Sequence, residues 1–352
     1  MNFTFSDDQL LFQSSVREFL AGEVTPTRIR ASWEREDGRD PALWQQLTEL
    51  GLVGLTVPEE FGGLGMSELD FVLLAQECGY VALPEPLVHT ALVAVPLLRQ
   101  LGGELAAEWL PRIAAGDAKV VVGLQQNLLV EDAHVADLLL LQQGDAWYAL
   151  APAQVDLRHN ESVDPSRRLY AVAMKSGTSP LVTGAQTDAL TATALDRGAL
   201  GCAAQALGLA QRMVDMAVSY SGDRQQFGKA IGSFQAVKHL MANVAVRLEY
   251  ARAPVHRAAY SLAQGEACAS RAVSQAKLGA CEAANLAAKN SIQVHGAMGY
   301  TWEVDLHIFM KKAWALANSW GDSAFHKARI ADYIFSDGAA LGAGATFVNA
   351  PA

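Results

Sequence analysis

The chain has 352 residues, of which 51% are hydrophobic and 18% are charged, and its formal net charge at pH 7 is −10. This length suits two or three domains better than one simple core. The acidic balance argues against a nucleic-acid-binding protein, which normally carries a basic face. No apolar run is long enough for a membrane span, so the many apolar residues favour buried subunit interfaces.

The cysteines and histidines show no pattern of a disulfide framework or a metal site. The histidines are dispersed, and none stands with an acidic residue at metal-ligand spacing. The N-terminal stretch MNFTFSDDQLLFQ is acidic and amphipathic and lacks the basic start and apolar stretch of an export signal. We therefore expect a cytoplasmic protein whose cysteines are small core residues in a reducing environment, namely Cys78, Cys202, Cys268 and Cys281.

Residues 1–117 have the pattern of an α-helical domain. SDDQLLFQSSVREFLAGEV opens with a serine cap, places acids in the first turn and repeats apolar residues at spacings of three and four. PALWQQLTELGLVGL and SELDFVLLAQECGYVAL predict two further helices, separated by the Pro/Gly loop VPEEFGGLGMS.

Residues 118–190 predict a small β domain. KVVVGLQQ, HVADLLLLQQGDAWYAL and RRLYAVAM combine β-branched and aromatic residues with short polar turns. Residues 191–338 are helical again and rich in alanine, and residues 339–352 have the composition of a disordered tail. One buried helical stripe is predicted by apolar residues that step by three or four, namely Leu240, Val244, Leu248, Ala251 and Val255.

A polar stretch interrupts the apolar helical region. SGDRQQFGKAIGSFQAVKHLMANVAV, which starts at Ser221, places an Arg, two Gln, a Phe and a Gly at a break between two helical runs. Such residues at a junction between buried helices indicate a ligand, because polar side chains there need a partner.

These residues resemble the acyl-CoA dehydrogenase family over nearly the whole chain. The stretches that carry the resemblance stand in the family's order, and they are FSDDQLLFQSSVREFL, LTELGLVGLTVPEEFGGLGMSELDFVLLAQECG, SYSGDRQQFGKAIGSFQAVKHLMA and IQVHGAMGYTWE. The resemblance implies a mainly α fold with an N-terminal helical domain, a middle β domain and a C-terminal four-helix bundle. It also implies FAD, a tetramer, and removal of two hydrogens from the α and β carbons of an acyl-CoA thioester.

The resemblance assigns a set of cofactor-binding residues. Arg224 would contact the FAD pyrophosphate, since a guanidinium matches phosphate oxygens. Gln293, with the turn through Gly296 and Ala297, would approach the adenine end; Ala297 stands where the family often has a second glycine. Further residues lining the cofactor would be Gln226, Phe227, Phe234 and Gln235. Without the motif, Arg224 would read as a surface arginine, and Gln293 and Gly296 as a helix end.

Two family features are missing. The stretch resembling TEPxAGSD, with the aromatic-Ile-Thr segment after it, is replaced by VVVGLQQNLLVEDAHVADLLLL, and the β domain is shortened. The two positions where relatives carry the catalytic Glu hold Trp320 and Gly198. Asp322 and Asp196 lie two residues away, too far displaced for the required geometry. Trp320 would either fill the core or plug a vestigial pocket, so we expect no catalytic residue from this chain.

This pattern of gain and loss predicts a supporting subunit. In the family tetramer the motifs kept here reach across an interface to a neighbour's FAD, whereas the missing ones serve the subunit's own site. The pattern resembles the shorter subunit of heterotetrameric steroid side-chain acyl-CoA dehydrogenases. It implies a longer, Glu-bearing partner, an acyl-CoA substrate and an acceptor like electron-transfer flavoprotein. The alternatives are a self-sufficient homotetrameric enzyme with an atypical base, and a structural partner that binds no flavin.

Overall fold

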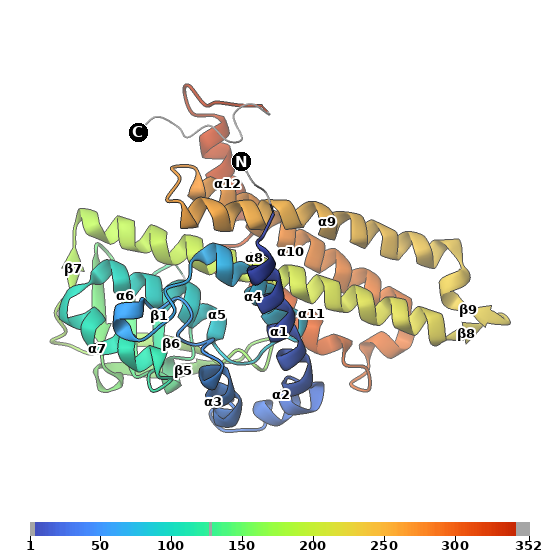
Figure 1. The fold of residues 1–352 in the computed structure, drawn as a ribbon, viewed down its shortest axis with the longest axis horizontal. Helices are drawn as coiled ribbons and strands as arrows, with labels where there is room; N and C mark the ends of the chain where they lie inside the picture. The colour runs from blue at the N-terminus through green and yellow to red at the C-terminus, as the bar shows by residue number, and fades with distance from the viewer. Residues whose placement is uncertain (1–3, 127–128, 343–352) are drawn as a thin grey trace. The chain divides into compact units, whose positions relative to one another are not determined.

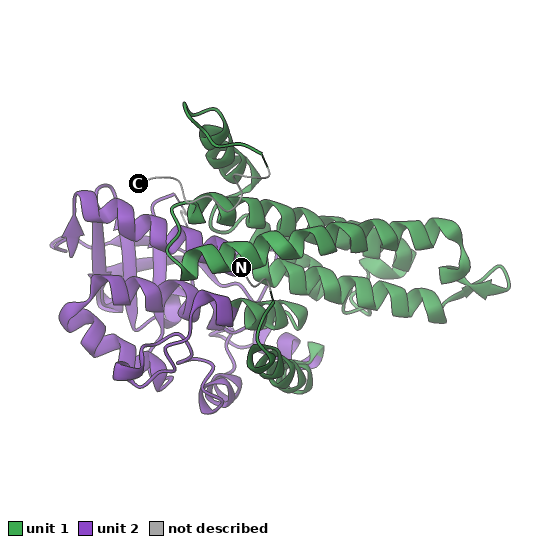
Figure 2. Cartoon of the chain, turned by 45° about the horizontal axis from the view of Figure 1, so that its top comes forward, with its two compact units in different colours: residues 1–26, 72–83, 202–352 green, residues 27–71, 84–201 purple. Residues whose placement is uncertain are grey.

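The computed structural model describes residues 4–126 and 129–342 (Figure 1). The contacts divide the chain into two compact units, coloured separately in Figure 2. Unit 1 comprises residues 1–26, 72–83 and 202–352, and unit 2 comprises residues 27–71 and 84–201. No helix in the described ranges is long and apolar enough to cross a membrane.

The elements confirm a mainly helical fold with a small β portion. Helix α4 (Glu68–Tyr80) and the long helix α8 (Ala185–Asp223) contribute to both units. The other elements of unit 1 are α1 (Asp7–Glu23), β8 (Gln225–Gln226), β9 (Lys229–Ala230), α9 (Gln235–Ala263), α10 (Ala269–His295), α11 (Leu306–Ala317) and α12 (Ser323–Ile334). The helices of unit 2 are α2 (Pro26–Trp33), α3 (Pro41–Glu49), α5 (Leu87–His89), α6 (Val95–Leu101) and α7 (Gly103–Ala114).

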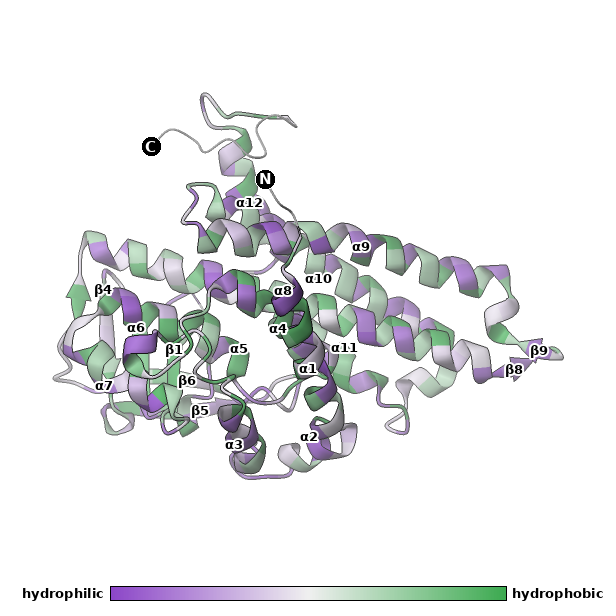
Figure 3. Ribbon diagram, viewed as in Figure 1, coloured by the Kyte–Doolittle hydropathy of each residue, from purple (hydrophilic) through white to green (hydrophobic). Residues whose placement is uncertain are grey.

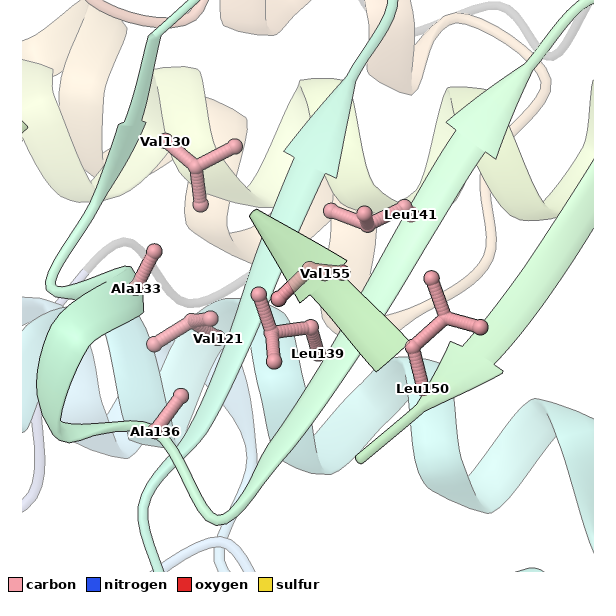
Figure 4. Close-up of a cluster of buried hydrophobic side chains, with 8 residues drawn as sticks. All are labelled: Val121, Val130, Ala133, Ala136, Leu139, Leu141, Leu150 and Val155. Carbon is pink, nitrogen blue, oxygen red and sulfur yellow. The ribbon is translucent and has the colours of Figure 1, made fainter. Parts of the chain in front are cut away.

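Unit 2 also holds two small sheets. One has the order β1-β3-β4-β7, with β1 (Val120–Leu124) parallel to β3 (Leu138–Gln143), and β4 (Ala146–Leu150) antiparallel to both β3 and β7 (Val182–Thr183). The other is antiparallel and has the order β2-β6-β5, formed by Leu129–Glu131, Leu169–Met174 and Val155–Asn160. Side chains from both sheets meet in one buried cluster (Figure 4), composed of Val121, Val130, Ala133, Ala136, Leu139, Leu141, Leu150 and Val155.

Local sequence signals set the helix ends and faces. The Ser6 hydroxyl accepts a hydrogen bond from the Gln9 amide at 3.2 Å, and the Gln9 side chain accepts one from the Ser6 amide, which confirms the predicted serine cap of α1. Hydrophobic and hydrophilic residues alternate along α9 in Figure 3, and Val244, Leu248, Ala251 and Val255 of the predicted stripe are buried.

Helix α10 lies centrally in unit 1. It packs along α9 and contacts α11 and α12. Alanine is the most frequent residue on its buried face, for example Ala276, Ala280, Ala284 and Ala287, and these short side chains let neighbouring helices approach closely. The domain boundaries expected at 117, 190 and 338 stay a prediction, and residues 343–352 of the expected disordered tail lie outside the described residues.

Two glycines allow α4 and α8 to touch through their backbones within unit 1. A Cβ atom at Gly208 would lie 2.5 Å from the Tyr80 amide nitrogen and would overlap the Gln76 carbonyl oxygen. A Cβ atom at Gly79 would lie 2.6 Å from Cα of Gln205. Because the obstacles are backbone atoms, no side-chain rotation can relieve the overlap. The crossing therefore requires glycine on both helices.

A buried ionic cluster joins loops of unit 2. The Arg39 guanidinium is 1% exposed, pairs with Asp132, and donates hydrogen bonds to the carbonyl oxygens of Pro84 at 2.7 Å and Ser166 at 3.0 Å. Glu85 lies in the same cluster and accepts a hydrogen bond from the Asp40 amide at 2.7 Å. Burial raises the pKa of Glu85 to about 7, although Arg39 and the Asp40 amide act in the opposite direction.

We predict that Gly208→Ala lowers the free energy of unfolding by about 3 kcal/mol or more, because the added methyl group forces α4 and α8 apart. Gly222 provides a matched control, since it lies in the same helix and an added Cβ meets no atom within 4 Å. Gly222→Ala should stabilise the chain by up to about 1 kcal/mol through helix propensity. Urea denaturation measures the free energy of unfolding of both variants. Equal changes for the two substitutions would contradict the backbone contact between α4 and α8 at Gly208.

We also predict a pH-dependent stability that originates at Glu85. Its folded-state pKa of about 7 exceeds the ordinary value of 4.5, so its contribution is complete below about pH 4.5 and is lost as pH rises through 7. The loss amounts to about 3 kcal/mol. Glu85→Gln should remove this part of the pH dependence in urea titrations at about pH 5 and pH 8. Glu104 is exposed in α7, so Glu104→Gln should leave the pH dependence of the free energy of unfolding as in the wild-type chain. An unchanged pH dependence in the Glu85→Gln variant refutes the prediction.

Candidate functional site

The candidate residues lie at one end of the helices of unit 1. Helix α8 ends at Asp223, the β8–β9 hairpin follows, and α9 begins at Gln235. The stack of the Tyr220 ring on the His295 ring, with centroids 4.4 Å apart, brings the C-terminus of α10 to the end of α8. A groove of about 490 Å³ adjoins this stack, and its walls include Arg212, Ser219 and Asp223.

The hairpin presents the first group of predicted residues. The Arg224 amide donates to the Tyr220 carbonyl, and the Arg224 carbonyl accepts from the Ile231 amide, both at 2.9 Å, so its backbone is held on both sides. Gln226 pairs with Lys229 across a two-residue turn in which Phe227 and Gly228 have φ of 52° and 77°. Positive φ at both central residues is the geometry of a type I′ turn.

The tip of this hairpin is apolar and exposed. Phe227 is 91% exposed and adopts a left-handed backbone conformation that aromatic residues rarely take. Its ring meets the edge of Phe234, with centroids 6.1 Å apart, and the Lys229 Nζ lies 4.4 Å from the centroid of Phe234. The exposed Gln235 follows as the first residue of α9.

The end of α10 carries the second group. Gly296 closes this helix with a φ of 61°, and its amide donates to the carbonyl oxygens of Gln293 and Ile292. Gln293, Gly296 and Ala297 are exposed. His295 is 5% exposed, and its Nδ1 donates to the Ser291 carbonyl at 2.8 Å. Burial lowers the pKa of His295, and the ring packs against Tyr220.

The polar side chains of both groups have no internal partners. Within the described residues, the side chains of Arg224, Gln226, Gln235 and Gln293 make no hydrogen bond or ion pair. A guanidinium and three amides that are exposed and unbonded can bind a phosphate and the edges of a heterocycle, and an exposed phenyl ring can pack against one. The set therefore fits a cofactor that carries both phosphate and an aromatic base.

The two positions at which the resemblance places the family's catalytic Glu hold Trp320 and Gly198. Trp320 is half-buried in the loop between α11 and α12, with φ of 55°, and His326 Nε2 donates to its carbonyl oxygen at 3.0 Å. Asp322 is exposed and accepts a hydrogen bond from the Phe325 amide at 2.8 Å, which caps α12. In unit 2, Gly198 is buried within α8 and Asp196 is 4% exposed.

The described residues contain no group of three or more His, Cys, Asp or Glu that could hold a metal ion. All four cysteines are free and buried, as expected from their scattered spacing.

Comparison with known proteins identifies the family. Residues 6–117 match the N-terminal domain of acyl-CoA dehydrogenases, and residues 189–335 match the C-terminal domain. The chain is 33% identical over 313 residues to the acyl-CoA dehydrogenase IpdE2 of Mycolicibacterium smegmatis, which covers 88% of this chain and 93% of that protein. The chain belongs to the acyl-CoA dehydrogenase family. Enzymes of this family are FAD-dependent oxidoreductases that act on CH–CH bonds.

Solved structures establish the same fold. A chain of the ChsE4–ChsE5 complex from Mycobacterium tuberculosis superposes with a TM-score of 0.84 at 22% identity, over 96% of this chain and 100% of that chain. The Tcur3481–Tcur3483 steroid ACAD gives a TM-score of 0.84 at 22% identity, over 93% and 98%. Residues 118–188, which include the small sheets, lie between the two family-domain matches.

We predict that Asp322 is a helix cap and not a catalytic base. Asp322→Ala should cost about 1 kcal/mol of stability, because the Phe325 amide loses its acceptor. Asp322→Asn keeps an oxygen that can cap the helix but removes the carboxylate, so it should leave both stability and turnover of the assembled enzyme unchanged. Denaturation curves and steady-state assays measure the two effects. A loss of about a hundredfold or more in turnover for the Asn variant would identify a base instead.

Proposed function

We propose that this chain is a subunit of a hetero-oligomeric, FAD-dependent acyl-CoA dehydrogenase and completes the FAD site of a longer companion. The observation that carries the proposal is the end of the helices in unit 1, where every predicted cofactor residue except the half-buried Phe234 is exposed. Within the described residues, the polar side chains among them make no hydrogen bond or ion pair. Exposed polar groups without a partner among the described residues are available to bind a ligand from outside the chain.

Each residue at this end of unit 1 would contact a different part of a dinucleotide. The Arg224 guanidinium would pair with pyrophosphate oxygens, for which its planar fork of donors is suited. The amides of Gln226, Gln235 and Gln293 would donate to and accept from polar edges of the cofactor. The Gly296 turn leaves room for close approach, since glycine has no side chain. FAD, when bound, supplies the hydride acceptor for the β carbon of the acyl thioester.

The exposed hairpin tip supports assembly with a second subunit. Phe227 leaves nearly all of its ring in water and adopts an unfavourable backbone conformation. Burying such a ring contributes about 2 kcal/mol, which is available only when another surface covers it. A companion subunit with its cofactor provides that surface, and the proposal therefore accounts for an aromatic residue at the tip of a solvent-exposed turn.

In this proposal the companion removes the α proton, because neither expected base position of this chain holds a Glu. Removal of the α proton requires a carboxylate within hydrogen-bonding distance of that carbon. Trp320 and Gly198 cannot accept a proton, and the Asp322 carboxylate caps α12. The companion would thus supply the Glu and hold the flavin ring, as in complete members of the family.

The proposal extends to substrate and partners. The substrate is an acyl-CoA thioester, and the resemblance to short subunits of steroid side-chain enzymes favours a steroid side chain. Two solved neighbours support this reading by their descriptions, one as a complex of ChsE4 with ChsE5 and the other as a steroid ACAD. A flavoprotein like electron-transfer flavoprotein would then accept the electrons.

Expression of the chain alone and together with its companion tests the proposal. The companion is sought as a longer dehydrogenase that carries the Glu and a TEPxAGSD-like stretch, encoded beside this chain. The chain alone should purify with little flavin and no turnover with steroid side-chain CoA thioesters, whereas the co-expressed complex should be yellow and active. A yellow, active homo-oligomer from this chain alone overturns the proposal and favours a self-sufficient enzyme.

We predict that Arg224→Ala in the co-expressed complex lowers the flavin content, because the pyrophosphate loses a bidentate cation worth about 2 kcal/mol or more. Arg247→Ala is the matched control, since Arg247 is also exposed in unit 1 but lies away from the hairpin, in α9. Flavin absorbance per complex after gel filtration measures both variants. Full flavin content in the Arg224 variant would instead favour a structural partner that binds no flavin.

A further inference from the structure

A pocket of unit 1 with a positively charged wall lies far from the cofactor residues. It has a volume of about 210 Å³ and lies between the start of α10, the end of α12 and residues 340–342. Arg271 of α10 lines it and precedes Gln293 by 22 residues of the same helix, which corresponds to about 33 Å along the axis. The pocket is therefore separate from the cofactor end.

The Arg271 guanidinium is held in place by an aromatic ring. Its Cζ lies 3.7 Å from the centroid of the Tyr333 ring, and the Tyr333 hydroxyl donates to the Ala340 carbonyl at 3.1 Å. Arg271 is half-buried, and within the described residues its side chain makes no hydrogen bond or ion pair. A ring face attracts the cation but uses none of the five N–H donors of a guanidinium. Those donors are therefore available to a ligand.

The positive charge of Arg271 is not compensated within the pocket. Among the described residues that line the pocket there is no Asp or Glu. The second arginine of the wall, Arg257, is paired with Glu266 and donates to the Cys268 sulfur at 3.5 Å. The groove at the cofactor end, by contrast, includes Asp215 and Asp223 in its wall. An uncompensated guanidinium in a chain with a net charge of −10 favours an anionic ligand.

A second donor stands beside Arg271. Gln275 follows four residues later in α10, so the two side chains share one helix face, and Gln275 lines the same pocket. It is exposed, and its amide makes no hydrogen bond within the described residues. A guanidinium and an amide side by side match the two oxygens of a carboxylate.

The wall of the pocket on the side of α12 is apolar. Ile330 and Ile334 line it, together with Leu341. Ile334 is 42% exposed and Leu341 is 61% exposed, so apolar surface beside the cation is left uncovered by the described residues. Burial of such surface stabilises a complex by about 25 cal/mol per Å². The volume is smaller than that of sites for drug-sized ligands, which begin at about 300 Å³, and so suits a short hydrocarbon chain.

We propose that this pocket binds a free carboxylate that carries a short hydrocarbon chain. Arg271 and Gln275 donate to the carboxylate oxygens, and the hydrocarbon chain lies against Ile330, Ile334 and Leu341. An inorganic anion would leave the apolar wall uncovered, and a neutral hydrocarbon would leave the guanidinium without a partner. The binding is non-covalent, and the inference does not depend on flavin or on a companion.

Isothermal titration calorimetry of the full-length chain with octanoate, acetate and octan-1-ol tests the proposal. Octanoate should bind about tenfold or more tightly than either other compound, because acetate lacks the chain and octan-1-ol lacks the charge. Equal binding of acetate excludes a role for the apolar wall, and equal binding of octan-1-ol excludes a role for the cation. Either result overturns the proposal, as does a failure of octanoate to bind.

Substitution of the arginine locates the binding. Arg271→Met removes the guanidinium and keeps an apolar stem, so octanoate should bind about tenfold or more weakly. Arg112→Met is the matched control, since Arg112 is also half-buried and its Cζ lies 4.4 Å from the centroid of the Trp109 ring, but it belongs to unit 2 and does not line the pocket. Circular dichroism verifies that each variant is folded. A folded Arg271→Met chain that binds octanoate as tightly as the wild type overturns the proposal.

A change of the apolar wall gives a second test. Ile334→Ser should weaken octanoate binding by about threefold or more, because the hydrocarbon chain loses an apolar contact. Val246→Ser is its control, since Val246 is 55% exposed in α9 and does not line the pocket. An unchanged octanoate affinity in the Ile334 variant contradicts the proposal, and this comparison decides if Arg271→Met does not fold.

Discussion

The backbone contact between α4 and α8 at Gly79 and Gly208 is the constraint on which the described site depends. It fixes the register of α8 against α4, because a shift of α8 by one residue would place a side chain where the backbone of α4 lies. Hydrogen bonds beside the crossing reinforce it, including that from the Tyr80 hydroxyl to Asp215 at 3.0 Å. From Gly208 the helix continues without a break to Asp223, a length of about 23 Å. The crossing therefore determines where Arg224 and the hairpin stand.

The same helix aligns the second group of predicted cofactor residues, at the end of α10. The Ser291 hydroxyl donates to the Met213 carbonyl at 3.0 Å, and His295 stacks on Tyr220, so two contacts on one side of α8 hold the last turns of α10. Polar groups that face the interior of unit 1, such as Ser291, are bonded within the packed helices. Exposed groups at this end, such as Arg224 and Gln293, make no hydrogen bond or ion pair within the described residues. This difference between bonded and unbonded polar groups separates structural residues from candidate binding residues at the end of unit 1.

The sequence predicts much of this arrangement and misses its tertiary details. Periodicity and capping residues predict α1 and the buried stripe of α9, because both depend on neighbours within one helix. The motif around Arg224 also lies within one short stretch of the chain, and it predicts a ligand site. The Arg39–Asp132 pair joins residues far apart in the chain, and no local pattern marks such a contact. Gly208 is one of 29 glycines, and no pattern in the sequence marks its contact with the backbone of α4.

The buried contact between Lys277 and Cys281, at 3.4 Å, is a tertiary detail that the sequence pattern marks in part. Lys277 and Cys281 are four residues apart and so share a helix face, which the sequence alone reveals. The sequence does not predict the hydrogen bond from Lys277 to the Leu316 carbonyl. It also does not predict the pocket that Cys281 lines. Both arise from the packing of α11 against α10, which no residue of α10 specifies by itself.

The hairpin tip also bears on the supply of this protein in a cell. Without the proposed companion, the chain carries an uncovered phenyl ring at the hairpin turn, and exposed apolar surface promotes self-association. Production in excess would thus feed aggregates and proteolysis, whereas synthesis in equal amounts beside the companion would not. If the proposed companion covers Phe227, the exposed turn favours synthesis of the two chains in equal amounts.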